Sequence, residues 1–181
     1  VRWIALLFSL VSLAFALVLW VRYDIGVPGY QFEQKAIWYA PINASFHLGV
    51  DGVSVSMILL TTILSPLAIL ASFGINDRVK MYMALFLLLE VGMLGVFMAL
   101  DLIIFFLFWE VGLVPMFLLI GVWGGARREY AAIKFFIYTL AGSVVGLLGI
   151  IAVYHDTGTF NVLQAAAARP FSDNPTWATL V

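Results

Sequence analysis

The order of apolar and polar positions divides the 181-residue chain into five long apolar segments. Each holds roughly 20 residues, the length that an α-helix needs to cross the hydrocarbon core of a bilayer. Residues 23–52, in contrast, mix Gly, Pro, charged and aromatic residues without helical periodicity, which predicts a long interfacial loop. The pattern therefore predicts an all-α, polytopic transmembrane helix bundle, one domain over residues 1–181. Its expected spans are residues 3–21, 53–75, 81–100, 102–123 and 131–154.

Composition supports a membrane protein and excludes several other classes. Hydrophobic residues make up 64% of the chain and charged residues 10%, so lipid is its expected surrounding. The net charge of −1 gives no basic surface for nucleic acid. The chain has no Cys, and its two His, at positions 47 and 155, are too far apart to suggest a metal site. We expect neither a cofactor nor a metal in this chain.

Basic residues in the short polar segments predict the orientation of the bundle. When the segments are assigned alternately to two sides, one side collects Arg2, Arg78, Lys80, Arg127 and Arg128. The positive-inside rule makes that side cytoplasmic. The loop 23–52 and the polar, Ala-rich tail 155–181 then lie on the non-cytoplasmic side. Because position 1 is Val and the last residues are again apolar, we expect the chain to be part of a longer protein.

Two carboxylic acids lie inside the predicted spans. Glu110 stands in the otherwise uncharged run 102–123, and a carboxylate near the bilayer centre costs roughly 2.5–3.5 kcal/mol, so it usually faces a partner, a cavity or an ion path. Glu90 lies in the preceding span, and the helical rise places the two carboxyls within about 5 Å in depth. Two acids at one level could share a proton. Alternatively, each simply hydrogen-bonds a neighbouring helix or another segment.

Two other residues bear on Glu110. Lys134 lies near the cytoplasmic start of the fifth span, where its side chain can extend to the membrane interface. Alternatively, a Lys near a buried acid can modulate the pKa of that acid. Pro115 frees the carbonyl of Val111, one turn from Glu110, which could hold a water molecule of a hydration path. A proline kink is equally an ordinary packing feature. No phosphate-binding loop and no nucleophile–base pair indicates soluble-type catalysis.

Several motifs together resemble one family of membrane subunits. Residues 99–125 (ALDLIIFFLFWEVGLVPMFLLIGVWGG) and 132–139 (AIKFFIYT) are similar to the proton-translocating, antiporter-like subunit M of NADH:quinone oxidoreductase, which is called subunit 4 in mitochondria. Residues 47–62 (HLGVDGVSVSMILLTT) resemble the start of the family's third helix. The LVPM sequence at 113–116 is typical of M rather than of the paralogous subunits L and N. The chain would correspond to roughly the second to sixth of about fourteen helices.

The resemblance implies a function and roles for three residues. Glu110 would be the central glutamate of the proton path and would work with a lysine on a later, broken helix outside these residues. Lys134 matches the lysine of the KFFIYT motif, which implies a role in modulating the pKa of the buried acid. Glu90 matches an acid on the preceding helix, which implies a secondary proton site. Protons would be moved by energy from NADH oxidation and quinone reduction in other subunits. The chain itself would carry out no redox chemistry.

The resemblance also implies a location and partners. The expected membrane is the bacterial inner membrane, with the mitochondrial inner membrane as the alternative. The expected partners are other membrane-arm subunits of a respiratory complex, especially the paralogous antiporter-like subunits. Two other functions stay open at this point. The chain could belong to a multi-subunit sodium/proton antiporter, or it could be a non-catalytic structural membrane subunit in which Glu110 affects only stability.

Overall fold

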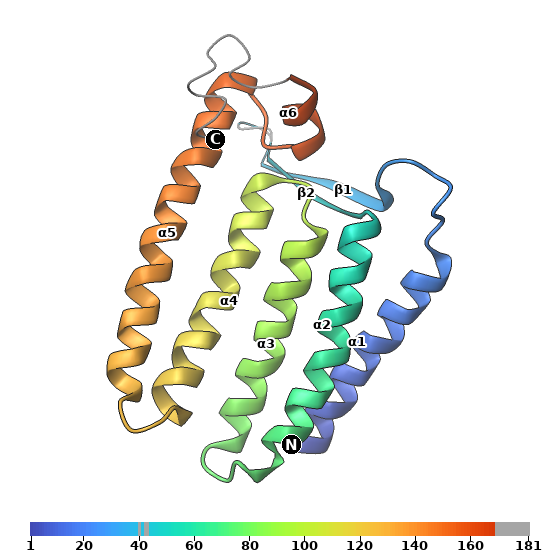
Figure 1. Cartoon of the computed structure of the whole chain (residues 1–181). Coiled ribbons are helices and arrows are strands. Elements are labelled where there is room, and N and C mark those ends of the chain that lie inside the picture. The colour runs from blue at the N-terminus through green and yellow to red at the C-terminus, as the bar shows by residue number, and fades with distance from the viewer. Residues whose placement is uncertain (40, 42–43, 169–181) are drawn as a thin grey trace.

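Five long helices dominate the computed structural model, which describes residues 1–39, 41 and 44–168 (Figure 1). All five are long and apolar enough to cross a membrane. The predicted all-α bundle of five spans is therefore confirmed. The long helices are α1 (Arg2–Arg22), α2 (Gly52–Ala71, extended by the 3₁₀ turn η2 at Ser72–Gly74), α3 (Val79–Met98), α4 (Leu102–Trp123) and α5 (Arg128–Thr157).

The long helices stand side by side, and α4 lies between α3 and α5 (Figure 1). Short connections make consecutive helices from α2 to α5 antiparallel. The connections that contain the basic residues 78, 80, 127 and 128 lie at the same end of the layer as the N-terminus. At that end, Arg2 donates hydrogen bonds to Asn76 Oδ1 at 2.7 Å and to the carbonyl of Ile75. The grouping agrees with the predicted topology, and the assignment of this end to the cytoplasm stays a prediction.

The ends of α4 and α5 follow from capping residues. The predicted span 102–123 coincides with α4, whose N-cap, Asp101, accepts hydrogen bonds from Ile103 N at 3.0 Å and Ile104 N at 3.4 Å. α5 is longer than predicted by three residues at each end. It stops at Gly158, whose φ of +71° is a left-handed conformation that glycine adopts without steric cost. Pro115 lies inside α4, as the sequence predicts.

The predicted loop between the first two spans contains a β-hairpin instead. Strands β1 (Gln31–Tyr39) and β2 (Ala44–Val50) pair antiparallel, with irregularities in the register between residues 31 and 34 and between residues 37 and 39. β1 is largely exposed, whereas β2 is mostly buried against the ends of the helices. The strands therefore form because β2 packs on the helix layer. The irregular register interrupts the alternation of apolar and polar residues that would have predicted them from the sequence.

The predicted polar tail from residue 155 is partly helical. α5 continues to Thr157, and a short helix, α6 (Val162–Ala168), follows after four residues. Both α6 and the hairpin lie at the end of the layer opposite the N-terminus (Figure 1). Residues 169–181 of the tail lie outside the described residues. Its position on the non-cytoplasmic side of the membrane stays a prediction.

Candidate functional site

α3 and α4 meet at a close contact between two glycines. A Cβ atom placed on Gly92 would meet the backbone N of Gly112 at 3.0 Å and its Cα at 3.2 Å. A Cβ on Gly112 would point at Leu89 Cδ1 of α3, 3.8 Å away. Gly92 and Gly112 therefore mark the faces with which the two helices contact each other.

Each of the two acids lies two residues before one of these glycines. Two residues turn an α-helix by about 200°, so Glu90 and Glu110 lie on the sides of α3 and α4 that face away from the contact. Since the helices are antiparallel, the acids are displaced from the contact in opposite directions and differ in depth by about 6 Å. The acids therefore point to opposite sides of the α3–α4 pair, an arrangement that argues against direct sharing of a proton.

Glu90 is almost completely buried, with 2% of its surface exposed. It faces the side of α3 on which α1 packs, and Ser12 of α1 interacts with its carboxyl group. Its Oε1 atom is buried and makes no hydrogen bond with any of the described residues. Glu90 is therefore an ionisable group inside the bundle whose hydrogen-bonding capacity is incompletely used.

Glu110 faces α5. Phe117 lies seven residues further along α4, on the same face, and its ring packs against that of Phe136 of α5 at a centroid distance of 5.1 Å. The Oε1 atom of Glu110 is buried and has no hydrogen-bond partner within the described part of the chain. A buried carboxyl oxygen without a partner lowers stability, so folding alone gives no reason for this residue.

The structure does not bring Lys134 to Glu110. Lys134 is exposed near the start of α5, with its ammonium 5.7 Å from the centre of the Tyr130 ring. It precedes Phe136 by two residues and so lies on the side of α5 opposite the α4 contact. Any influence on Glu110 has to act over a distance, as an electrostatic effect from the end of the helix.

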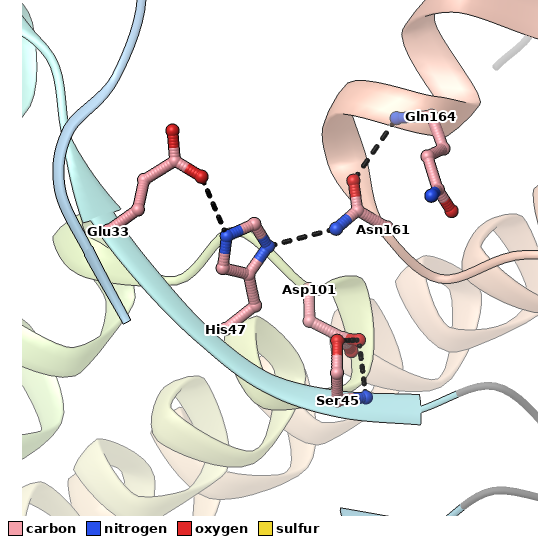
Figure 2. Close-up of polar contacts among 6 residues, drawn as sticks. All are labelled: Glu33, Ser45, His47, Asp101, Asn161 and Gln164. Atoms are coloured by element: carbon pink, nitrogen blue, oxygen red, sulfur yellow. Dashed lines mark hydrogen bonds and ion pairs between the residues drawn. The ribbon is translucent and has the colours of Figure 1, made fainter. Parts of the chain in front are cut away.

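A polar network at the hairpin end joins three segments that are distant in sequence (Figure 2). His47 of β2 is buried, and its Nε2 lies 3.0 Å from Glu33 Oε2 of β1. Its Nδ1 lies 2.9 Å from Asn161 Nδ2, which precedes α6. Asn161 Oδ1 in turn accepts a hydrogen bond from Gln164 N at 3.1 Å. His47 thus links the hairpin to α6, and it contributes to no metal cluster among the described residues.

Asp101 is the second centre of this network. Besides capping α4 with Oδ1, it accepts hydrogen bonds through Oδ2 from Ser45 N at 2.9 Å and from Ser45 Oγ at 3.3 Å (Figure 2). Asp101 lies between the predicted spans 81–100 and 102–123, and no role is predicted for it or for His47 from the sequence. An acid directly before an apolar helical run is an N-cap signal that would have identified Asp101. Nothing in the sequence indicates the pairing of His47.

The backbone between α3 and α4 is also held on both sides. Leu100 N donates to the carbonyl of His47 at 2.9 Å, and Leu102 N donates to that of Phe160 at 2.8 Å. Val162 N donates to the carbonyl of Leu100 at 3.0 Å. The three-residue connection 99–101 therefore fixes the ends of the two helices that carry Glu90 and Glu110.

Comparison with known proteins agrees with the resemblance seen in the sequence. Residues 99–179 match the family described as NADH:quinone oxidoreductase/Mrp antiporter, transmembrane. The chain is 44% identical over 182 residues to NADH-quinone oxidoreductase subunit M of Rhodobacter capsulatus, covering 99% of this chain and 35% of the relative. It is 41% identical over 175 residues to NADH-ubiquinone oxidoreductase chain 4 of Arabidopsis thaliana, covering 96% of this chain and 35% of the relative.

A solved structure gives the same result for the fold. The chain superposes on part of the respiratory complex I from Thermus thermophilus with a TM-score of 0.82 and 25% sequence identity, over 99% of this chain and 38% of the matched chain. This chain thus spans about a third of the length of the curated relatives it matches. The relatives come from a bacterium and a plant, which agrees with an integral protein of a bacterial or mitochondrial inner membrane. Residues 99–179 therefore resemble the NADH:quinone oxidoreductase/Mrp antiporter transmembrane family, and the chain as a whole is similar to about a third of NADH-quinone oxidoreductase subunit M.

Proposed function

We propose that this chain is part of a membrane-arm subunit that moves protons through Glu110, coupled to NADH oxidation and quinone reduction in other subunits. The observation that carries the proposal is the carboxyl group of Glu110. Glu110 lies on the face of α4 that packs against α5, and its Oε1 atom is buried without a hydrogen-bond partner in the described residues. A group that lowers stability in this way, in a chain similar to part of subunit M, is best explained by its chemistry.

The proposed mechanism uses a change in the charge around Glu110. A cationic side chain that approaches Glu110 favours the ionised carboxylate and proton release, and its withdrawal favours proton uptake. The approaching group is proposed to be a lysine in another part of the longer protein. The close contact at Gly92 and Gly112 keeps α3 and α4 in register during this cycle. The partners of the subunit would be other antiporter-like subunits of the same complex.

Glu90 and Lys134 have secondary roles in this proposal. Glu90 faces α1, so it would serve a separate proton position on the other side of the α3–α4 pair. Lys134, on the outward side of α5, would modulate the local potential without contacting Glu110. We therefore expect substitutions of Glu90 and Lys134 to reduce transport less than substitution of Glu110 does.

The test is Glu110→Gln in the full-length protein within the assembled complex. Gln keeps the size of the side chain but cannot take up and release a proton, so NADH-driven proton transport should fall by about 100-fold or to background, while assembly stays intact. Proton transport in sealed vesicles and the rate of quinone reduction are measured together. Glu129→Gln, which removes an exposed carboxylate at the start of α5, is the matched control and should transport normally. Normal coupled transport in Glu110→Gln would overturn the proposal.

A sodium/proton antiporter is the second candidate, because the matched family includes Mrp antiporters as well as NADH:quinone oxidoreductases. The two functions differ in their energy source. Transport that depends on sodium and proceeds without NADH would favour the antiporter. Co-purification with subunits that oxidise NADH favours the respiratory complex.

A purely structural subunit makes a third, distinct prediction. In that case Glu110→Ala would change only the stability of the assembled protein, and the remaining protein would transport protons at the normal rate per complex.

A further inference from the structure

Ser143 is a buried hydroxyl that folding does not explain. α5 lies wholly within the described residues, and its buried side chains are Ala132 and Ser143. Ser143 is 7% exposed, and its Oγ makes no hydrogen bond with the described residues. Ser65 of α2, in comparison, is 3% exposed and donates to the carbonyl of Thr61 at 2.9 Å. An unpaired buried hydroxyl costs free energy that a bonded one does not.

The packing of α4 against α5 shows what Ser143 faces. A Cβ placed on Gly121 would lie 3.5 Å from Ala132 Cβ, and four residues further toward the hairpin end Phe117 packs on Phe136. These two contacts define one antiparallel register. Seven residues further in the same direction, this register pairs Glu110 with Ser143. Seven residues advance each helix by about 10 Å and return to within about 20° of the same face.

The register therefore places two buried, unpaired oxygens opposite each other. They are Glu110 Oε1 and Ser143 Oγ. They are not hydrogen-bonded to each other in the structure, so a contact between them requires a rotation of a side chain or a bridging water molecule. α5 packs on α4 and on α6, so a side chain buried in the middle of α5 is covered by α4.

We propose that the hydroxyl of Ser143 hydrogen-bonds the carboxyl group of Glu110, directly or through one water molecule, and so positions it in the proton path. The inference rests on the function proposed above. A serine hydroxyl can donate to an ionised carboxylate and accept from a protonated one, so the contact persists through both states of Glu110. Ser143 is thus a positioning residue that acts through Glu110.

The test compares Ser143→Thr with Ser143→Val in the full-length protein within the assembled complex. The two side chains have the same shape, and only Thr keeps a hydroxyl. Dicyclohexylcarbodiimide, which reacts with protonated carboxyl groups in apolar surroundings, is applied, and its rate of attachment to Glu110 and Glu90 is followed by mass spectrometry. NADH-driven proton transport is measured across a range of pH in the same preparations.

We expect Ser143→Val to label at Glu110 about three- to tenfold faster than Ser143→Thr, because loss of a donor to the carboxylate leaves more of it protonated. The pH dependence of transport should change with it, whereas Glu90 should label at an unchanged rate. Ser65→Ala, which removes a hydroxyl bonded to its own helix, should change neither rate. If Ser143→Val does not assemble, Ser143→Ala replaces it with the same expectation.

Equal labelling of Glu110 in the Thr and Val variants would overturn the inference. So would an equal acceleration at Glu90, which would indicate a general loosening of the bundle. Labelling reports on the carboxyl group itself, so it is independent of whether Glu110 carries transported protons. Glu110→Gln tests that question separately, and the two proposals can therefore fail independently.

Discussion

The hairpin end of the molecule and the middle of its helix layer differ in how completely their buried polar groups are hydrogen-bonded. At the hairpin end, His47, Asp101 and Asn161 are buried and each is hydrogen-bonded to at least two other groups. In the middle of the layer, Glu90 and Glu110 each have a buried oxygen that makes no hydrogen bond within the described residues. Polar groups that hold a fold together are normally paired, so the unpaired ones are the candidates for function.

The largest expected effect comes from breaking the paired region at Asp101. Asp101→Ala removes the cap of α4 and both hydrogen bonds to Ser45, and should lower the free energy of unfolding by about 3 kcal/mol. Thermal unfolding of the purified protein measures this loss. Glu110→Gln is the contrasting variant and should be no less stable than the unaltered protein, because it replaces a carboxyl group whose Oε1 atom is buried and unpaired with a neutral amide of the same size. Equal losses in both variants would remove the distinction between the two regions.

A second, smaller effect concerns the contact that orients the two acids. Gly92→Ala places a methyl group against the backbone of Gly112, so the helices must separate, and we expect a loss of about 2 kcal/mol together with reduced proton transport. Gly112→Ala is the matched control, because its methyl group has ordinary space beside Leu89. A helix gains from Gly→Ala where space allows, so this variant should be as stable as the parent or slightly more so. Equal stability and equal transport in the two variants would show that α3 and α4 do not approach closely at Gly92 and Gly112.

The link between the hairpin and α6 should show a measurable coupling. In a double-mutant cycle, His47→Ala and Asn161→Ala are compared alone and together by chemical unfolding. Because the two side chains are hydrogen-bonded, their coupling energy should be about 1 kcal/mol. The same cycle between His47 and Ser12, which lies on α1, serves as the control and should give additive effects. An additive result for His47 and Asn161 would show that this contact does not stabilise the fold.

The smallest expected effect is the pH dependence of a helix cap at the hairpin end. Asp51 caps α2 by accepting a hydrogen bond from Ser54 N at 2.8 Å, and this bond holds the pKa of the carboxyl below its usual value. The cap therefore stabilises the folded protein above the usual carboxyl pKa of about 3.9, and the stabilisation disappears as the pH falls through the lowered pKa.

Asp51→Asn keeps a capping side chain but cannot titrate. Its stability should therefore be less sensitive to acid than that of the parent, while Asp51→Ala should lose about 1 kcal/mol at neutral pH. Unfolding measured from pH 7 down to acid conditions distinguishes the three proteins. The same acid sensitivity in Asp51→Asn and the parent would show that other groups cause it.

The helices could be predicted from the sequence because lipid imposes length and apolarity directly. The bounds of α4 can be predicted to the residue, since a charged residue and a glycine flank a run in which Glu110 is the only charged residue. The depths of Glu90 and Glu110 could also be estimated, because depth depends only on the helical rise. The directions in which they point could not, because these depend on the helix contact at Gly92 and Gly112. Their roles in transport stay predictions.

Residues that depend on tertiary contacts were missed for the same reason. Strand β2 is defined by its packing on the helix ends, and His47 by its partners in two other segments. Ser143 gives only a weak signal in the sequence, a polar residue within an apolar helix. Its significance follows from the register of α4 against α5, which no local pattern contains.

The backbone hydrogen bonds around Leu100 and Leu102 have a consequence for changes in chain length. A residue inserted between Met98 and Ile103 would displace this short connection from its hydrogen-bond partners. The backbone bonds to His47, Phe160 and Val162 would all be disturbed at once. Within the described part of the chain, the backbone of residues 124–127 makes only local hydrogen bonds, so this turn between α4 and α5 can absorb an added residue locally. Related chains should therefore vary in length at residues 124–127 but hold the distance from the end of α3 to Asp101 constant.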